Sequence, residues 1–202
     1  MRAIKRIYCH CTGSMVGTVD SIRKFHTASP PAGRGWRDIG YHYVVLNPYP
    51  TLEELAEDNP LRDLDGSYNL GRRIEIPGAH VGKIVIKGKT YPGDNAESVA
   101  IALIGGNEGI LGRKSLESKY GPIPLLLPFC PFSEAQIRMT LSLCKELMRR
   151  FRLGIKDVLG HYEWPSGAKQ GKTCPDLDMN RFRVLLDDYI TSKKINIELL
   201  KR

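Results

Sequence analysis

The residues of this sequence best suited to chemistry are two histidines and one cysteine. His161 is followed thirteen positions later by Cys174, in the run HYEWPSGAKQGKTCPDLD, and His10 ends a strand-like run, IKRIYCHC, far upstream. Two imidazoles and a thiolate leave the fourth position of a tetrahedral zinc ion open for water or substrate, as a hydrolase requires. Lys172 adds a cation two residues before Cys174. The pattern indicates a metal site whose purpose depends on the surrounding elements.

Each of these residues also has an ordinary structural explanation. A single histidine at a strand end is more often a hydrogen-bonded core residue than a ligand, and a single cysteine is usually a small buried hydrophobe. Cys9 and Cys11 alternate with His10 along the strand, so we expect both in the core on the opposite face. By the same alternation, His42 points away from Tyr41.

Length, composition and charge restrict the class of protein. The chain has 202 residues, a net charge of +8 and five cysteines. This length favours one domain, and the positive charge favours an anionic partner such as nucleic acid, a membrane surface or the bacterial cell wall. An odd number of cysteines argues against a disulfide framework. We find no secretory signal and no apolar stretch of roughly 20 residues, so we expect a soluble protein made in the cytoplasm.

Hydrophobic periodicity predicts an α/β domain with a central mixed β-sheet flanked by helices. The expected helices lie at 20–27, from Ser133 onward, and after Asp178, with Ile22, Phe25 and His26 facing inward from the first. The expected strands lie at 3–11, 40–47, on either side of Gly88, at 98–104 and at 156–159, the last of which delivers His161. Two stretches, at about 48–72 and 109–131, are interpreted as surface insertions in a single domain of residues 1–202, the first with a short helix at 52–56.

The motifs carried by these elements resemble a known enzyme family. IYCHCTGS, GYHYVV, GAHV, SVAIALIGG, GHYEW and KTCPDLDM occur in that order along most of the chain. Together they resemble the zinc-dependent N-acetylmuramoyl-L-alanine amidases of the peptidoglycan-recognition-protein fold, especially the phage lysozyme-amidase branch. Each motif is short, and their order makes the resemblance specific.

The resemblance implies a site and a reaction. It places one catalytic Zn²⁺ on His10, His161 and Cys174, with Tyr41 and Lys172 as catalytic residues. His80 falls in a loop that lines the substrate groove in the family. The implied reaction is hydrolysis of the amide between N-acetylmuramic acid and L-alanine, with peptidoglycan or muropeptides as partner and no specific nucleic acid or membrane partner.

Several alternatives remain open from the sequence. A non-catalytic peptidoglycan-binding module can share this fold, although such proteins usually lack the cysteine ligand that Cys174 provides. A nucleic-acid-binding protein is supported by charge alone, and a structural zinc site would require a fourth protein ligand. We expect a monomer that acts as a phage or prophage endolysin after release to the wall. A recycling enzyme acting on soluble muropeptides in the cytosol, or an antibacterial effector, would have a similar sequence.

Overall fold

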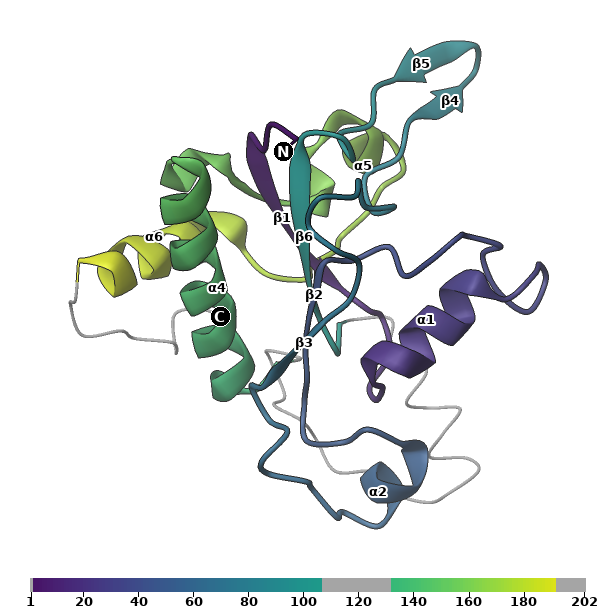
Figure 1. Cartoon of the computed structure of the whole chain (residues 1–202), viewed down its shortest axis with the longest axis vertical. Coiled ribbons are helices and arrows are strands. Elements are labelled where there is room, and N and C mark those ends of the chain that lie inside the picture. Colours follow the sequence, from purple (N-terminus) through teal and green to yellow (C-terminus); the bar gives the residue numbers. More distant parts are fainter. Residues whose placement is uncertain (1, 107–131, 192–202) are drawn as a thin grey trace.

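The computed structural model describes residues 2–106 and 132–191 (Figure 1). In chain order, its strands are β1 (Arg6–Cys11), β2 (Tyr43–Val45), β3 (Tyr68–Leu70), β4 (Ile84–Ile86), β5 (Lys89–Tyr91), β6 (Ser98–Leu103) and β7 (Val158–Gly160). Its α-helices are α1 (Val19–Thr27), α2 (Leu52–Ala56), α4 (Glu134–Phe151), α5 (Pro165–Lys169) and α6 (Met179–Ile190). Two short 3₁₀-helices, η1 (Ile155–Asp157) and η2 (His161–Glu163), flank β7.

Five strands form the central sheet in the order β3-β2-β6-β1-β7. The strands β2, β6, β1 and β7 run parallel, and β3 pairs antiparallel with β2 at one edge. All six residues of β6 are buried, as expected for a strand at the middle of a sheet that is covered on both faces. The expected α/β fold with a mixed sheet flanked by helices is confirmed.

The two faces of the sheet have different roles. Figure 1 shows α4 and α6 on one side of the sheet and α1 on the other. Ile7 and Cys9 of β1 join the large core cluster beneath α4 and α6, together with alternate residues of β6. Burying each such aliphatic side chain contributes about 1.5–3 kcal/mol. Because side chains alternate along β1, Tyr8 and His10 point to the other face, on the side of α1.

Helix α4 follows the sequence prediction closely. Ser133 caps it through the backbone N–H of Gln136, and the Gln136 side chain returns to the Ser133 backbone in a capping box. Gln136 is also buried and donates from Nε2 to the carbonyl of Ile104 at 2.9 Å, which ties the helix start to the sheet. The helix ends at Phe151, and the next residue, Arg152, has the left-handed backbone conformation common just after helix ends.

The stretch at 48–72 contributes regular structure to the fold. Its helix α2 has the bounds expected from the sequence and is capped by Thr51, while its last residues form the edge strand β3. The second stretch, 109–131, lies outside the described residues. The organisation of 1–202 as one domain with two insertions stays a prediction.

Several details differ from the sequence-based expectations. The strand expected at 3–11 begins at Arg6. The strand expected at 40–47 is limited to β2. The strand expected at 156–159 begins at Val158, because the Asp157 carboxylate accepts from the Gly154 backbone N–H and closes the short helix η1 just before β7. Phe25 was expected to face inward but is 48% exposed. The inward positions of α1 are taken by Val19, Ile22 and His26, and the Arg34 guanidinium covers one face of the Phe25 ring.

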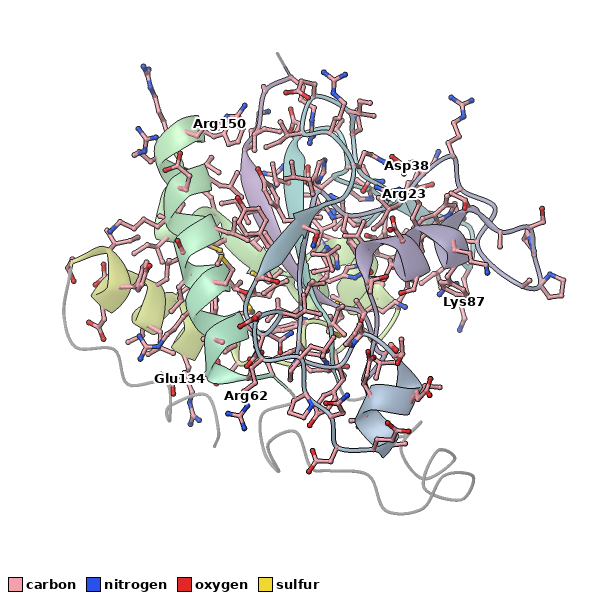
Figure 2. The ribbon with its side chains drawn as sticks, turned by 60° about the horizontal axis from the view of Figure 1, so that its bottom comes forward. Arg23, Asp38, Arg62, Lys87, Glu134 and Arg150 are labelled. Atoms are coloured by element: carbon pink, nitrogen blue, oxygen red, sulfur yellow. The ribbon has the colours of Figure 1, made fainter. Side chains whose placement is uncertain are left out.

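The positive charge of the chain is distributed over the surface. In Figure 2 the labelled cations Arg62, Lys87 and Arg150 lie at well-separated points of the molecule. Arg23 on α1 lies beside Asp38, with Nε 3.0 Å from the carboxylate. Among the described helices, none has the length and apolar character that crossing a membrane would require.

Candidate metal centre

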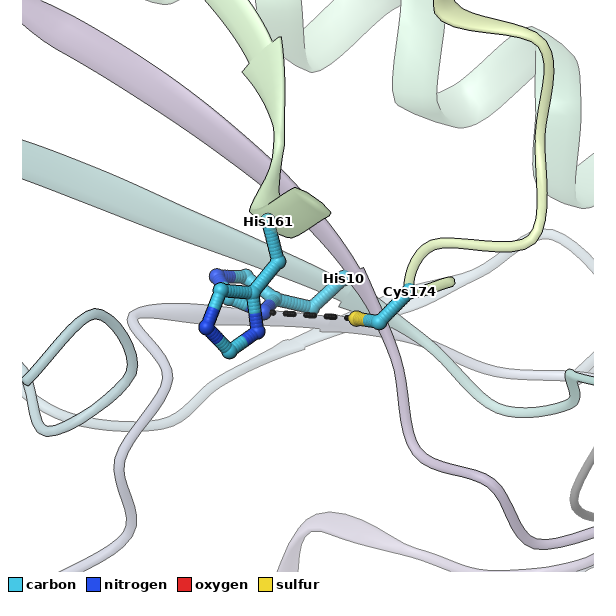
Figure 3. A group of neighbouring side chains, drawn as sticks. All are labelled: His10, His161 and Cys174. Carbon is cyan, nitrogen blue, oxygen red and sulfur yellow. Dashed lines mark hydrogen bonds between the residues drawn. The ribbon is translucent and has the colours of Figure 1, made fainter. Parts of the chain in front are cut away.

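His10, His161 and Cys174 meet at one end of the parallel strands (Figure 3). One donor atom from each residue lies within 4.8 Å of the donors of the other two. Nδ1 of His10 is 3.6 Å from Sγ of Cys174, and the His10 and His161 rings are 4.8 Å apart between centroids. The structure therefore brings together the three ligands expected from the sequence.

The sheet register explains how His10 and His161 meet. Cys9 of β1 pairs with Gly160, the last residue of β7. His10, the next residue of β1, and His161, which directly follows β7, therefore lie side by side near the carboxyl end of the sheet. This edge of a parallel sheet is where ligands usually bind. The site thus follows from the parallel pairing of two strands that are far apart in sequence.

The loop that carries Cys174 is held against His161 by backbone contacts. The Tyr162 N–H donates to the Cys174 carbonyl at 3.1 Å. Gly167 of α5 packs so closely that a Cβ at this position would lie 2.0 Å from the His161 carbonyl oxygen. Only glycine permits this approach, which places α5 beside the metal ligands.

The chemistry of the three donors fits zinc. A tetrahedral ion with Zn–S near 2.3 Å and Zn–N near 2.05 Å separates sulfur from nitrogen by about 3.6 Å, which is the spacing between Cys174 and His10. Interaction with the neighbouring Cys11 side chain is the main cause that lowers the pKa of Cys174 well below its usual value. The Cys11 backbone N–H also lies 3.2 Å from the Cys174 sulfur. Burial lowers the pKa of His10, which favours the neutral imidazole that a metal requires.

The position of Cys11 differs from the one expected from the sequence. Cys9 is buried in the core as expected, but Cys11 is only half-buried and lies at the metal centre. Its thiol is 3.4 Å from the Asp176 carboxylate, and its backbone holds the Cys174 sulfur. Cys11 is the last residue of β1, so it packs against the edge of the core and at the same time contacts the loop that carries Cys174.

A cavity of about 640 Å³ opens over the three donors. Tyr41 and Lys172 both line it, and the Tyr41 ring lies 5.3 Å from the His10 ring between centroids. Lys172 is exposed at the cavity wall, in the segment that follows α5. The structure therefore places both expected catalytic residues in the cavity that contains the donors.

His26, Arg34 and Trp36 are among the cavity-lining residues that were not expected at the site from the sequence. His26 was expected only to pack on its helix, yet it lies between Trp36 and Tyr41, with ring centroids 4.6 and 5.4 Å away. Arg34 and Trp36 belong to the loop SPPAGRGW, which has no hydrophobic periodicity. The charge of Arg34 and the aromatic ring of Trp36 were the signals that the sequence of this loop offered.

The remaining histidines have distinct positions. His80 is buried and lies against His10, with its Nδ1 3.1 Å from Nε2 of His10, while its side chain also reaches the cavity wall. His42 accepts the Ala100 N–H at Nδ1, and its ring lies 5.9 Å from the His80 ring between centroids. His42 is absent from the lining of the cavity over the donors.

The long segment between His161 and Lys172 forms η2 and α5 and carries Trp164. The Trp164 indole donates to the Pro92 carbonyl at 2.9 Å. The Arg6 guanidinium lies over its ring at 4.7 Å, and Tyr8 meets it edge-on. Trp164 thus connects this segment to β1 near the metal centre.

Comparisons with known proteins agree with this fold. Residues 1–176 match the model of the N-acetylmuramoyl-L-alanine amidase family. The chain belongs to this family. A comparison with curated protein sequences gave no match.

Solved structures show the same fold. The N-acetylmuramoyl-L-alanine amidase LysC from Clostridium intestinale URNW is 19% identical, with a TM-score of 0.57 over 92% of this chain and 87% of that one. The endolysin amidase LysCS from the same organism is 18% identical, with a TM-score of 0.56 over 92% and 85%. A Drosophila PGRP-LB variant in complex with tracheal cytotoxin is 16% identical, with a TM-score of 0.50 over 87% and 76%.

Proposed function

We propose that this protein is a zinc-dependent N-acetylmuramoyl-L-alanine amidase that hydrolyses the amide between N-acetylmuramic acid and L-alanine in peptidoglycan. The observation that carries the proposal is the convergence of His10, His161 and Cys174 on a cavity that also contains Tyr41 and Lys172. Membership of the amidase family supports the same reaction.

The donors and the cavity residues have complementary tasks in this proposal. Zinc held by the three donors would supply Lewis-acid polarisation and lower the pKa of a water molecule toward 7. Tyr41, whose ring lies 5.3 Å from that of His10 between centroids, would orient that water or donate a hydrogen bond to the oxyanion. The Lys172 ammonium would neutralise the negative charge that develops on the former carbonyl oxygen.

The cavity is also suited to an anionic ligand. Arg34 and Lys172 both contribute cations to its wall. Muropeptides carry free carboxylates on their peptide stems, and a cleft lined by positive charge raises the local concentration of such ligands. This supports peptidoglycan or muropeptides as the substrate class.

For the biological setting, we propose lysis of the bacterial wall by a phage or prophage endolysin. The likeness to the LysCS endolysin amidase supports this setting. Comparing the rate on intact walls with the rate on soluble muropeptides tests it. An endolysin degrades intact walls efficiently, whereas a recycling enzyme prefers the soluble fragments.

The activity itself can be tested by counting new amino termini. Purified zinc-loaded protein is incubated with cell walls, and free amino groups are labelled with fluorodinitrobenzene. We expect labelled alanine to increase with time, and the Cys174→Ser variant to release none. Wall binding without new alanine termini would instead identify a non-catalytic binding module, and new reducing sugar ends would identify a glycosidase.

A further inference from the structure

The histidine ligand His10 has a buried partner on the side that faces away from Cys174. Its Nδ1 atom lies 3.6 Å from Cys174 Sγ, and its Nε2 atom lies 3.1 Å from Nδ1 of His80. The His10 and His80 side chains belong to residues that are 1% and 7% exposed, so water does not compete for this contact. If Nδ1 of His10 is to bind a metal, its ring hydrogen must reside on Nε2.

The direction of the hydrogen bonds beyond His80 is determined by a backbone carbonyl. Ser98 Oγ lies 2.6 Å from the carbonyl oxygen of Asp94 and 3.3 Å from Nε2 of His80. A carbonyl oxygen can only accept, so the single hydroxyl hydrogen of Ser98 is donated to Asp94. Ser98 must then accept from Nε2–H of His80. A neutral imidazole with hydrogen on Nε2 has a lone pair on Nδ1, and this lone pair faces His10.

Contacts on both sides hold this chain of hydrogen bonds in place. The backbone N–H groups of His80 and Val81 donate to the Asn95 side-chain oxygen at 3.0 and 2.8 Å. The Asp94 carboxylate accepts from Arg6 at 2.7 Å and from the Tyr8 hydroxyl at 3.0 Å. The segment around residue 94 and the loop of His80 are therefore tied together and to β1.

We propose that His80 is a positioning residue that sets the tautomer of His10. It accepts the Nε2–H of His10 and thereby directs the Nδ1 lone pair of His10 toward the metal, while Ser98 fixes the tautomer of His80. This inference rests on the proposed zinc site. It assigns His80 a role different from the contact with substrate that the sequence suggested.

Partners of this kind orient metal ligands and raise their basicity, and their loss typically reduces metal affinity about 10- to 100-fold. Three variants separate the possibilities. His80→Leu removes the acceptor, His80→Asn keeps an oxygen acceptor near the position of Nδ1, and Ser98→Ala removes the group that fixes the tautomer of His80.

Two measurements on the full chain test the proposal, and neither requires substrate. The first is the tautomer of His10 in metal-free protein, read from long-range ¹H–¹⁵N NMR spectra of the imidazoles. The second is the zinc dissociation constant, measured by competition with a chromophoric chelator. Because both are independent of turnover, a failure of the proposed amidase activity would not be confused with a failure of this inference.

We expect the hydrogen of His10 on Nε2 in the metal-free wild type, and a mixture of tautomers in His80→Leu. We also expect zinc affinity to fall about 10- to 100-fold in His80→Leu, less in Ser98→Ala, and to recover largely in His80→Asn. Circular dichroism verifies that each variant is folded. A wild-type His10 protonated at Nδ1 overturns the proposal, as does a folded His80→Leu variant with unchanged tautomer and zinc affinity. If His80→Leu does not fold, the wild-type tautomer and Ser98→Ala decide.

Discussion

Sγ of Cys174 lies 3.6 Å from Nδ1 of His10, although 164 positions separate the two residues in sequence. The spacing is that of two ligands on one tetrahedral zinc ion. It arises because β1 and β7 are parallel neighbours and because the Tyr162 N–H ties the Cys174 loop to the end of β7.

Replacing Cys174 with serine should abolish stoichiometric zinc binding. The wild type should contain about one zinc ion per chain, and the variant far less, because two imidazoles and a hydroxyl bind zinc weakly compared with a set that includes a thiolate. Metal analysis after dialysis against trace zinc measures this. Cys144→Ala, which removes a buried thiol in the core beneath α4, is the matched control and should retain zinc. Full zinc occupancy in Cys174→Ser would contradict the assignment.

Replacing Lys172 with glutamine should reduce kcat about a hundredfold while leaving zinc content unchanged. The loss corresponds to one donor removed from a developing oxyanion, about 3 kcal/mol of barrier. Lys169→Gln is the matched control, since Lys169 lies nearby at the end of α5, where its ammonium is 6.0 Å from the Tyr91 ring centroid. Equal effects of the two substitutions would show that the role of Lys172 is only general electrostatics.

Removing the Tyr41 hydroxyl should reduce kcat by one to two orders of magnitude, about 10- to 100-fold, without loss of zinc. Tyr41→Phe keeps the ring that packs between His10 and His26, so the fold should be preserved. Tyr43→Phe is the control, because Tyr43 lies on the other face of the sheet and packs against Tyr68. An unchanged kcat in Tyr41→Phe would remove Tyr41 from the mechanism.

The free energy of unfolding should fall as the pH is lowered. Burial is the main cause that lowers the pKa of both His26 and His42 to about 4, whereas an unfolded histidine titrates near 6.5. The unfolded chain therefore binds protons first, so stability from these groups is complete above about pH 7 and is lost progressively from about pH 6.5 to pH 4.

Urea unfolding of metal-free protein at several pH values measures this slope. His42→Gln should have a shallower slope than the wild type, even if it is less stable at every pH. If the free energy of unfolding stayed constant or increased as the pH was lowered from 6.5 to 4, the assigned burial of these histidines would be contradicted.

Much of the fold was predictable because its elements have clear periodicity. The apolar run of β6 and the capping box and apolar stripe of α4 indicate their structures locally, and the structure confirms both. The short strands were harder. The β2 and β7 strands have three residues each, and their ends are decided by contacts with neighbouring segments instead of by their own sequences.

The candidate site was only partly predictable. The zinc donors could be named from their residue types and from the order of the family motifs, but the contact of Cys11 with Cys174 could not, because it depends on where the Cys174 loop crosses the end of β1. The His10–His80 contact joins residues 70 positions apart across the fold, so no local pattern reveals it. Arg34 lies in a loop without hydrophobic periodicity, so its position in the cavity wall could not be predicted from the sequence either.

The central claim is that the protein hydrolyses the amide between N-acetylmuramic acid and L-alanine, and the position of an oxygen label tests it most directly. A soluble muropeptide is incubated with zinc-loaded protein in H₂¹⁸O, and the products are analysed by mass spectrometry. We predict a peptide with a free L-alanine amino terminus and a muramic acid whose lactyl carboxylate carries one ¹⁸O atom. An intact muropeptide, or label incorporated at any other bond, would contradict the proposed function.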